Sequence, residues 1–258
     1  MSAIPHPESR SKALWFTASI IAFFLIWELV CRLFAVPPFI LPPPSAAFLA
    51  MWTERELLFG KHLWVTTSEV ILGLTASIIC GVAVALAMSV SRPIERLFYP
   101  YVVISQTIPY MALSPIFIYW FGYSLTGKIA ITILFIFFPI VVNTFDGLRA
   151  ADSEMINLLR TMGATRRQIF LKAQIPAALP SFFSGLKVAA TYSVSGAIIG
   201  EWLGASAGLG YFARRASGYF RADTMFATIL LLVFMGVALF MLTSWLERRF
   251  TYQRSTKP

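Results

Sequence analysis

Residues 64–90 read WVTTSEVILGLTASIICGVAVALAMSV and contain a single charged side chain, Glu69, in 27 positions. A helix crosses the hydrocarbon core of a bilayer with about 20 consecutive, mostly apolar residues, so this stretch is expected to span a membrane. The whole chain agrees, because its 258 residues are 58% hydrophobic and 13% charged, with a mean hydropathy of +0.73. Soluble globular domains are much less apolar and carry more charge.

Five further stretches of this kind predict an all-α, polytopic membrane protein with six transmembrane helices. The expected spans are residues 14–34, 64–90, 97–121, 128–147, 183–203 and 224–246. An even number of spans leaves both ends on one side, and assigning both ends to the cytoplasm places most lysines and arginines there. No small-residue cleavage site follows the first apolar run, so we expect a retained helix rather than a signal peptide.

The segments between and beyond these spans complete the expected organisation. Residues 1–13 and 247–258 are expected to be cytoplasmic tails, and residues 35–63 an outer-face loop with an interfacial helix. Residues 64–246 are expected to form a five-helix core that contains a long cytoplasmic loop at 148–182.

Several function classes are excluded by composition. The net charge of +9 is explained by cytoplasmic loops, so no nucleic-acid partner is expected. The sequence shows no cluster of side chains typical of a catalytic site, and its two histidines build no metal site.

Residues 122–128, GYSLTGK, resemble the start of a phosphate-binding loop, but Ile129 stands where Ser or Thr would bind magnesium. We interpret this stretch as a glycine turn between spans.

The cytoplasmic loop contains the pattern DSEMINLLRTMGATRRQIFLKAQIP at residues 152–176. Asp152 or Ser153 can cap a short helix that ends at Gly163, and Thr165 with Gln168 has the spacing of a capping box for a second helix that Pro176 ends. The first helix has an apolar face made of Met155, Leu158, Leu159 and Met162. The result is a helix, glycine turn and helix, which we call the knob. Such a pair could also lie along the bilayer surface.

Glu154, Gly163-Ala164 and Ile175-Pro176 resemble the EAA loop of permease subunits in bacterial binding-protein-dependent ABC importers. The family's Glu-Ala-Ala reads Glu154-Met155-Ile156 here, which departs from the pattern at the two alanines. The resemblance extends over roughly residues 64–246 and includes FFPIVVNT at 137–144 and GEWLGASAGLGYF at 200–212.

This resemblance implies a type I ABC importer permease fold in the bacterial inner membrane, with the first helix at the periphery. It implies that the knob binds a separate dimeric ATPase subunit, which would hold ATP and magnesium, whereas this chain itself holds no cofactor and is not an enzyme. A second, identical permease subunit, an extracytoplasmic solute-binding protein and the lipid bilayer are the other implied partners. The residues implied in coupling to the ATPase are Glu154, Met155, Leu158, Leu159, Met162, Gly163, Ala164, Ile175 and Pro176.

Polar side chains inside the expected spans are candidates for a translocation pathway. We single out Gln106, Asn143, Ser193 and Glu201. Hydrogen bonding between helices is the competing explanation for each of them. Gly196 and Gly200 have the GxxxG spacing that lets helices approach closely, either within one chain or between two.

Only the resemblance limits the range of candidate solutes. It is to the nitrate, sulfonate, taurine and thiamine-pyrimidine branch of these permeases. TSEVILG at 67–73 and QTIPYMALSPIFIYWFG at 106–122 favour a thiamine-precursor pyrimidine or a riboflavin-like compound, with sulfonate, taurine or nitrate as the alternative. An ion-coupled secondary transporter is the alternative of another class. It would need membrane-embedded charges in paired, broken helices and an inverted repeat, and the sequence shows no repeat.

Overall fold

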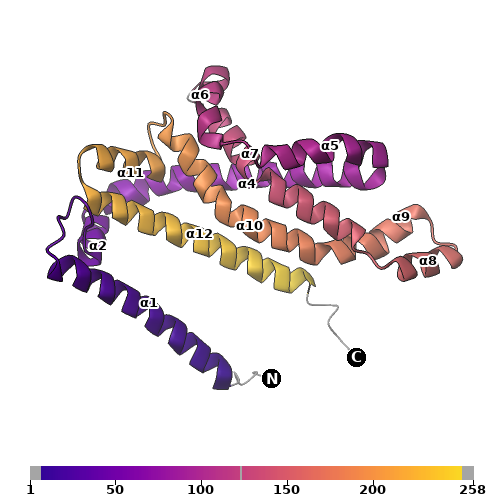
Figure 1. The fold of residues 1–258 in the computed structure, drawn as a ribbon, viewed down its shortest axis with the longest axis horizontal. Helices are drawn as coiled ribbons and strands as arrows, with labels where there is room; N and C mark the ends of the chain where they lie inside the picture. The colour runs from indigo at the N-terminus through magenta and orange to yellow at the C-terminus, as the bar shows by residue number, and fades with distance from the viewer. Residues whose placement is uncertain (1–6, 123, 252–258) are drawn as a thin grey trace.

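A computed structural model describes residues 7–122 and 124–251, which form helices joined by short loops, with no strand in these two ranges (Figure 1). The elements are α1 (Pro7–Leu33), α2 (Pro44–Thr53), α3 (Arg55–Leu57), the π-helical turn η1 (Leu58–His62), α4 (Leu63–Val90), α5 (Arg92–Ser105), α6 (Tyr110–Phe121), α7 (Leu125–Arg149), α8 (Ser153–Thr161), α9 (Arg166–Ile169), the π-helical turn η2 (Phe170–Gln174), α10 (Ile175–Trp202), α11 (Leu209–Gly218) and α12 (Ala222–Thr251). Five helical stretches in the described part are long and apolar enough to cross a membrane, or six if the bent pair α5 and α6 counts as one span.

Helix α7 is the centre of the bundle, and its main neighbours are α10 and α4. A Cβ atom placed on Gly185 of α10 would overlap the carbonyl oxygen of Pro139 on α7. A Cβ on Gly196 would lie 3.1 Å from the Cα of Thr132, so the GxxxG pair of α10 packs inside this chain. Lipid tails are as apolar as leucine, so membrane helices associate through close packing of this kind.

The long axis of the molecule separates two ends (Figure 1). Helices α8 and α9 lie at one end, and α2 and α11 lie at the other. Helices α10 and α12 run side by side between the two ends. Helices α4, α7, α10 and α12 thus form one bundle with the knob at one end.

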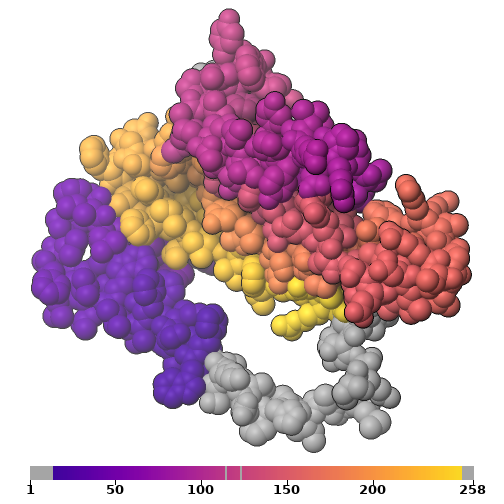
Figure 2. All heavy atoms as spheres, turned by 45° about the vertical axis from the view of Figure 1, so that its right-hand side comes forward, coloured from indigo at the N-terminus to yellow at the C-terminus, as the bar shows by residue number. Residues whose placement is uncertain are grey.

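Helix α1 lies at the edge of the bundle, where α2 packs on α12 and the Trp27 ring of α1 lies 5.5 Å from Phe226 of α12; α1 and α2 form one side of the molecule in Figure 2. Glu28 is an acidic residue in the apolar part of α1. Its carboxylate accepts hydrogen bonds from the guanidinium of Arg32 at 2.7 Å, and from the backbone N–H and hydroxyl of Ser45 at 3.0 and 2.8 Å. The charge therefore joins α1 to the first turn of α2, where the helix dipole favours it.

The prediction of one continuous helix at 97–121 is wrong. The chain forms α5 and α6 instead, and their axes meet at 94°. Pro109 lies directly before α6 and has φ −73° and ψ 97°. Proline cannot donate a backbone hydrogen bond and restricts the residue before it to extended geometry, so the helix breaks here.

We predict that Gly185→Ala destabilises the protein, because the added methyl group meets backbone atoms of α7 that cannot move aside. The expected loss is about 2 kcal/mol, the usual cost of overpacking a tight contact. Thermal unfolding in detergent would measure it. Gly236→Ala in α12 is the matched control, because its Cβ would meet nothing within 4 Å. Equal melting temperatures for the two variants would contradict the role assigned to Gly185.

Candidate functional site

The first helix of the knob, α8, exposes apolar side chains at the end of the molecule. The side chain of Asp152 accepts a hydrogen bond from the N–H of Glu154 at 2.8 Å, which confirms the predicted cap. Met155, Leu158 and Met162 are 52%, 56% and 74% exposed. Leu159 is half-buried, and Glu154 is exposed in the first turn of the helix. Much of the apolar face of α8 is therefore not covered by any other described part of this chain.

The turn between α8 and α9 has the predicted geometry. Gly163 has a φ of +78°, and the Ala164 N–H donates to the carbonyl of Leu159 at 2.9 Å. The capping box of α9 is also confirmed, because Thr165 N–H donates to Gln168 Oε1 at 2.8 Å and Gln168 N–H donates to Thr165 Oγ1 at 3.3 Å. Only glycine adopts a positive φ at no steric cost, so this residue fixes the angle between the two helices.

The prediction that Pro176 ends the second helix is wrong. Helix α9 continues through the π-helical turn η2 into α10, where Pro176 lies in the first turn. A proline inside a helix has no N–H to donate and its ring crowds the preceding turn, and here the wider π-helical turn η2 lies directly before Pro176 and accommodates it. Residues 166–202 are consequently one helical stretch of 37 residues, and the fifth span is longer than predicted.

Gln106 and Asn143, two of the four pathway candidates, line the same hollow of about 400 Å³. Gln106 caps the end of α5, and Asn143 lies on α7. Sequence analysis missed that Tyr110 and Phe135 line the hollow with them. Tyrosine and phenylalanine are so common in membrane helices that nothing in the sequence separated these two from the rest.

Ser193 and Glu201, the other two pathway candidates, do not line the hollow. Both have no exposed surface. The hydroxyl of Ser193 donates to the carbonyl of Ala190 at 2.7 Å, within its own helix. In this structure both side chains lie buried between helices, and their place in a pathway stays a prediction.

Glu201 instead caps α11 from inside the bundle. Its carboxylate accepts the backbone N–H groups of Gly210 and Tyr211 and the hydroxyl of Thr66. The Thr66 oxygen accepts the N–H of Leu209 at 2.7 Å. The first N–H groups of a helix have no partner within the helix and carry a positive dipole, so a carboxylate stabilises them. Glu201 thereby joins α4, α10 and α11.

Glu69 and Lys128 form a second polar contact near the same end. The Lys128 ammonium lies 2.6 Å from Glu69 Oε1, and the side chains of Lys128 and Glu69 are 14% and 2% exposed.

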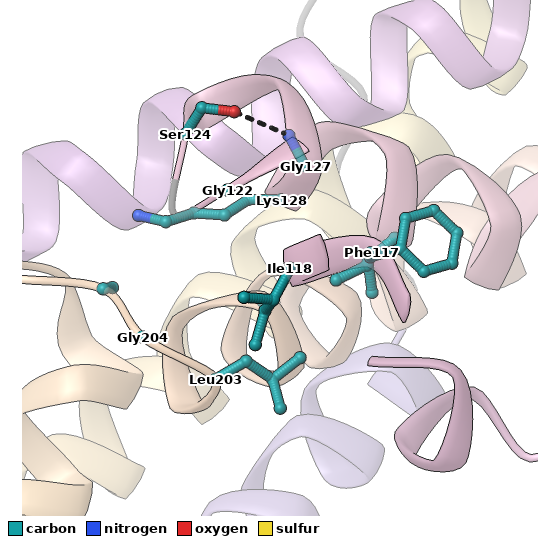
Figure 3. Close-up of a pocket in the computed structure, with 11 residues that line it drawn as sticks. Phe117, Ile118, Gly122, Ser124, Gly127, Lys128, Leu203 and Gly204 are labelled. Atoms are coloured by element: carbon teal, nitrogen blue, oxygen red, sulfur yellow. Dashed lines mark hydrogen bonds between the residues drawn. The ribbon is translucent and has the colours of Figure 1, made fainter. Parts of the chain in front are cut away.

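Ser124 caps the start of α7 by accepting the N–H of Gly127, and Figure 3 shows the Lys128 side chain extending away from this turn. The adjoining cavity has about 10 Å³ of free space, which is room for a single water. Residues 124–128 of the GYSLTGK stretch therefore form the start of α7, with Lys128 in an ion pair.

The fold and the exposed knob define the chain as a membrane permease, and known proteins identify the family. Residues 73–252 match the family described as "Binding-protein-dependent transport system inner membrane component". The chain belongs to this family. A solved structure of the MetNI methionine ABC transporter, in inward-facing conformations, has the same fold, with a TM-score of 0.67 and 22% identity over 77% of this chain and 98% of that one. The type I ABC importer permease fold is thereby confirmed.

Curated relatives cover nearly the whole chain. The formylaminopyrimidine transport permease protein ThiX of Halalkalibacterium halodurans is 43% identical over 88% of this chain and 90% of its own length. The riboflavin transport system permease protein RibX of Chloroflexus aurantiacus is 30% identical over 92% of this chain and 88% of its own. A putative aliphatic sulfonates transport permease protein SsuC of Bacillus subtilis is 30% identical over 95% and 88%. This chain is a permease subunit of an ABC importer, and ATP hydrolysis belongs to a separate subunit in such systems.

We predict that Glu201→Ala loosens α11, because two N–H groups lose their acceptor inside the bundle. An unsatisfied buried donor costs about 1–3 kcal/mol. A lower melting temperature in detergent and faster proteolysis between residues 204 and 211 would show the loss. Glu201→Gln keeps one carbonyl oxygen and should be intermediate. If the alanine variant matched the wild type in both measurements, the capping role would be wrong.

Proposed function

We propose that this permease subunit imports a thiamine-precursor pyrimidine of the formylaminopyrimidine type. The observation that carries the proposal is the 43% identity to a formylaminopyrimidine permease along 88% of the chain. The similarity of this chain to a riboflavin permease supports the same chemical class of solute, because riboflavin is also a flat heterocycle. Import of sulfonate, taurine or nitrate is the alternative, and permeases for aliphatic sulfonates and for taurine are relatives of 30% and 26% identity.

The knob is proposed to bind a separate ATPase dimer that holds ATP and magnesium. An apolar helix face that lies in a groove is a common mode of protein recognition. The exposed Met155, Leu158 and Met162 supply such a face. The remaining residues proposed to couple to the ATPase are Glu154, Leu159, Gly163, Ala164, Ile175 and Pro176. Because α9 is continuous with α10, a displacement of the knob would move a membrane helix directly.

The chain is proposed to pair with a second copy of itself and to receive solute from a binding protein on the outer face. Both termini are proposed to be cytoplasmic, on the side of the knob. The distribution of lysine and arginine supports this orientation. Helices α1 and α12, at the two ends of the chain, begin and end toward the knob end of the bundle, which also supports it (Figure 1).

Reconstitution tests the substrate. The permease, its ATPase and its binding protein would be placed in liposomes and given labelled formylaminopyrimidine, with taurine as the anionic comparison. We expect uptake of the pyrimidine that requires ATP. Uptake of taurine but not of the pyrimidine would favour the alternative, and uptake by the chain alone without ATP would favour a secondary transporter.

We predict that Gly163→Val weakens ATPase binding, because a β-branched residue is strained at a φ of +78°. Gly163→Asn is the matched control, because asparagine tolerates this geometry. Copurification from mild detergent, followed by an ATP hydrolysis assay, would measure the difference. The valine variant should lose most of the bound ATPase and the asparagine variant should keep it. Equal retention would contradict the proposed contact.

A further inference from the structure

The hollow between α5, α6, α7 and α10 has properties that the family assignment does not explain. Its volume of about 400 Å³ lies in the range of small-molecule sites, which is about 300–1,000 Å³. It contains both aromatic rings and amide groups, and none of its described lining residues is charged. Such a mixture of apolar walls with a few polar groups is typical of sites that bind and orient a small ligand.

Three aromatic rings from three different helices form one wall. The ring of Phe135 on α7 lies 5.0 Å from that of Tyr110 on α6, in an edge-to-face arrangement. It lies 6.1 Å from the ring of Tyr192 on α10, also edge to face. Tyr192 is 53% exposed, so part of this wall is open to a ligand. Aromatic faces favour other flat π systems.

Two amides provide hydrogen bonds beside these rings. Asn143 donates one N–H to the carbonyl of Pro139 at 2.8 Å, which fixes its orientation. Its oxygen, and the whole amide of Gln106, make no hydrogen bond to any other described residue. Gln106 is exposed and Asn143 is partly exposed, so both amides are free to bind water or a ligand. Together they offer both donors and acceptors.

The lysines of α7 and α10, the two helices that supply most of the lining, are already paired. Lys128 on α7 is bound to Glu69, and Lys187, one residue before the lining residue Val188, lies 2.8 Å from Glu247. Sulfonate and nitrate are anions, and proteins usually hold them with arginine, lysine or several N–H groups. The hollow therefore suits an uncharged ligand better than an anion.

We propose that this hollow is a transit site for a flat, uncharged nitrogen heterocycle, which stacks on Tyr192 and Phe135 while Gln106 and Asn143 bind its polar edge. The assignment of this ligand class rests on the proposed function. Because one side of the hollow is open, binding there is weak, and the solute can leave after each transport cycle.

The first test uses the complex of permease and ATPase in lipid nanodiscs without the binding protein. Saturation-transfer NMR with formylaminopyrimidine should show transfer to the ring protons. Tyr192→Leu and Gln106→Leu should weaken binding about tenfold, within the range measured for stacking on aromatic side chains. Tyr192→Phe keeps the ring and should bind as the wild type does. Absence of transfer in the wild type, or equal transfer in all variants, would overturn the transit site whatever is transported.

The second test measures uptake and ATP hydrolysis together in liposomes that contain the complete importer. The two leucine variants should move about tenfold fewer pyrimidine molecules per ATP, with hydrolysis still stimulated by the binding protein. Retained hydrolysis shows that the variants fold and assemble. If the wild type imports the pyrimidine and the variants do so equally well, the transit site is wrong and the proposed function stands. If the wild type imports no pyrimidine, the proposed function is wrong, and the NMR result decides the site separately.

Discussion

Direct contact between the backbone of α7 and its neighbours is the constraint on which the rest of the structure depends. Membrane helices gain little from hiding apolar side chains from lipid, so they associate where small residues let their backbones meet. Gly185 and Gly200 of α10 supply these contacts on one side of α7. The same contacts place polar groups, because Gly185 lies against Asn143 and Gly200 lies against Lys128. One row of glycines thus sets both the packing of the bundle and the direction of its polar side chains.

The polar groups inside the bundle are of two kinds, and the difference separates structure from function. Near the end that carries α11, Glu201 and Glu69 have strong partners from other helices, and these contacts join α4, α7, α10 and α11. In the hollow, Gln106 and one side of Asn143 have no partner among the described residues. A charge in a membrane is tolerated when it is paired. The paired groups therefore hold the bundle together, and the unpaired amides are the ones available to a solute.

Much of this architecture could be predicted from the sequence, and the failures have physical causes. Apolar runs predicted most of the membrane spans. The spacing of Gly163, Thr165 and Gln168 predicted the two helices and the turn of the knob, because caps and turns depend on residues only a few positions apart. Pro176 was misread because a π-helical turn lets the helix continue past it, and a single sequence carries no local signal for such a turn. The capping contacts of Glu201 could not be predicted because its partner Thr66 is 135 positions away along the chain. Contacts of that range depend on helix packing, which a single sequence does not encode in any local pattern.

The continuous helix from Arg166 to Trp202 determines how movement at the knob can reach the hollow. A helix transmits displacement along its axis, and glycine contacts hold α10 rigidly against α7, so these two helices would move as one body. Helices α5 and α6 have fewer contacts with the bundle, and an ion pair between Glu95 and Arg149 joins the start of α5 to the end of α7. The break between α5 and α6 lies at Gln106, on the wall of the hollow. Relative motion is therefore easiest at the wall where the solute would bind, which gives a conformational change at the ATPase a direct mechanical route to the transit site.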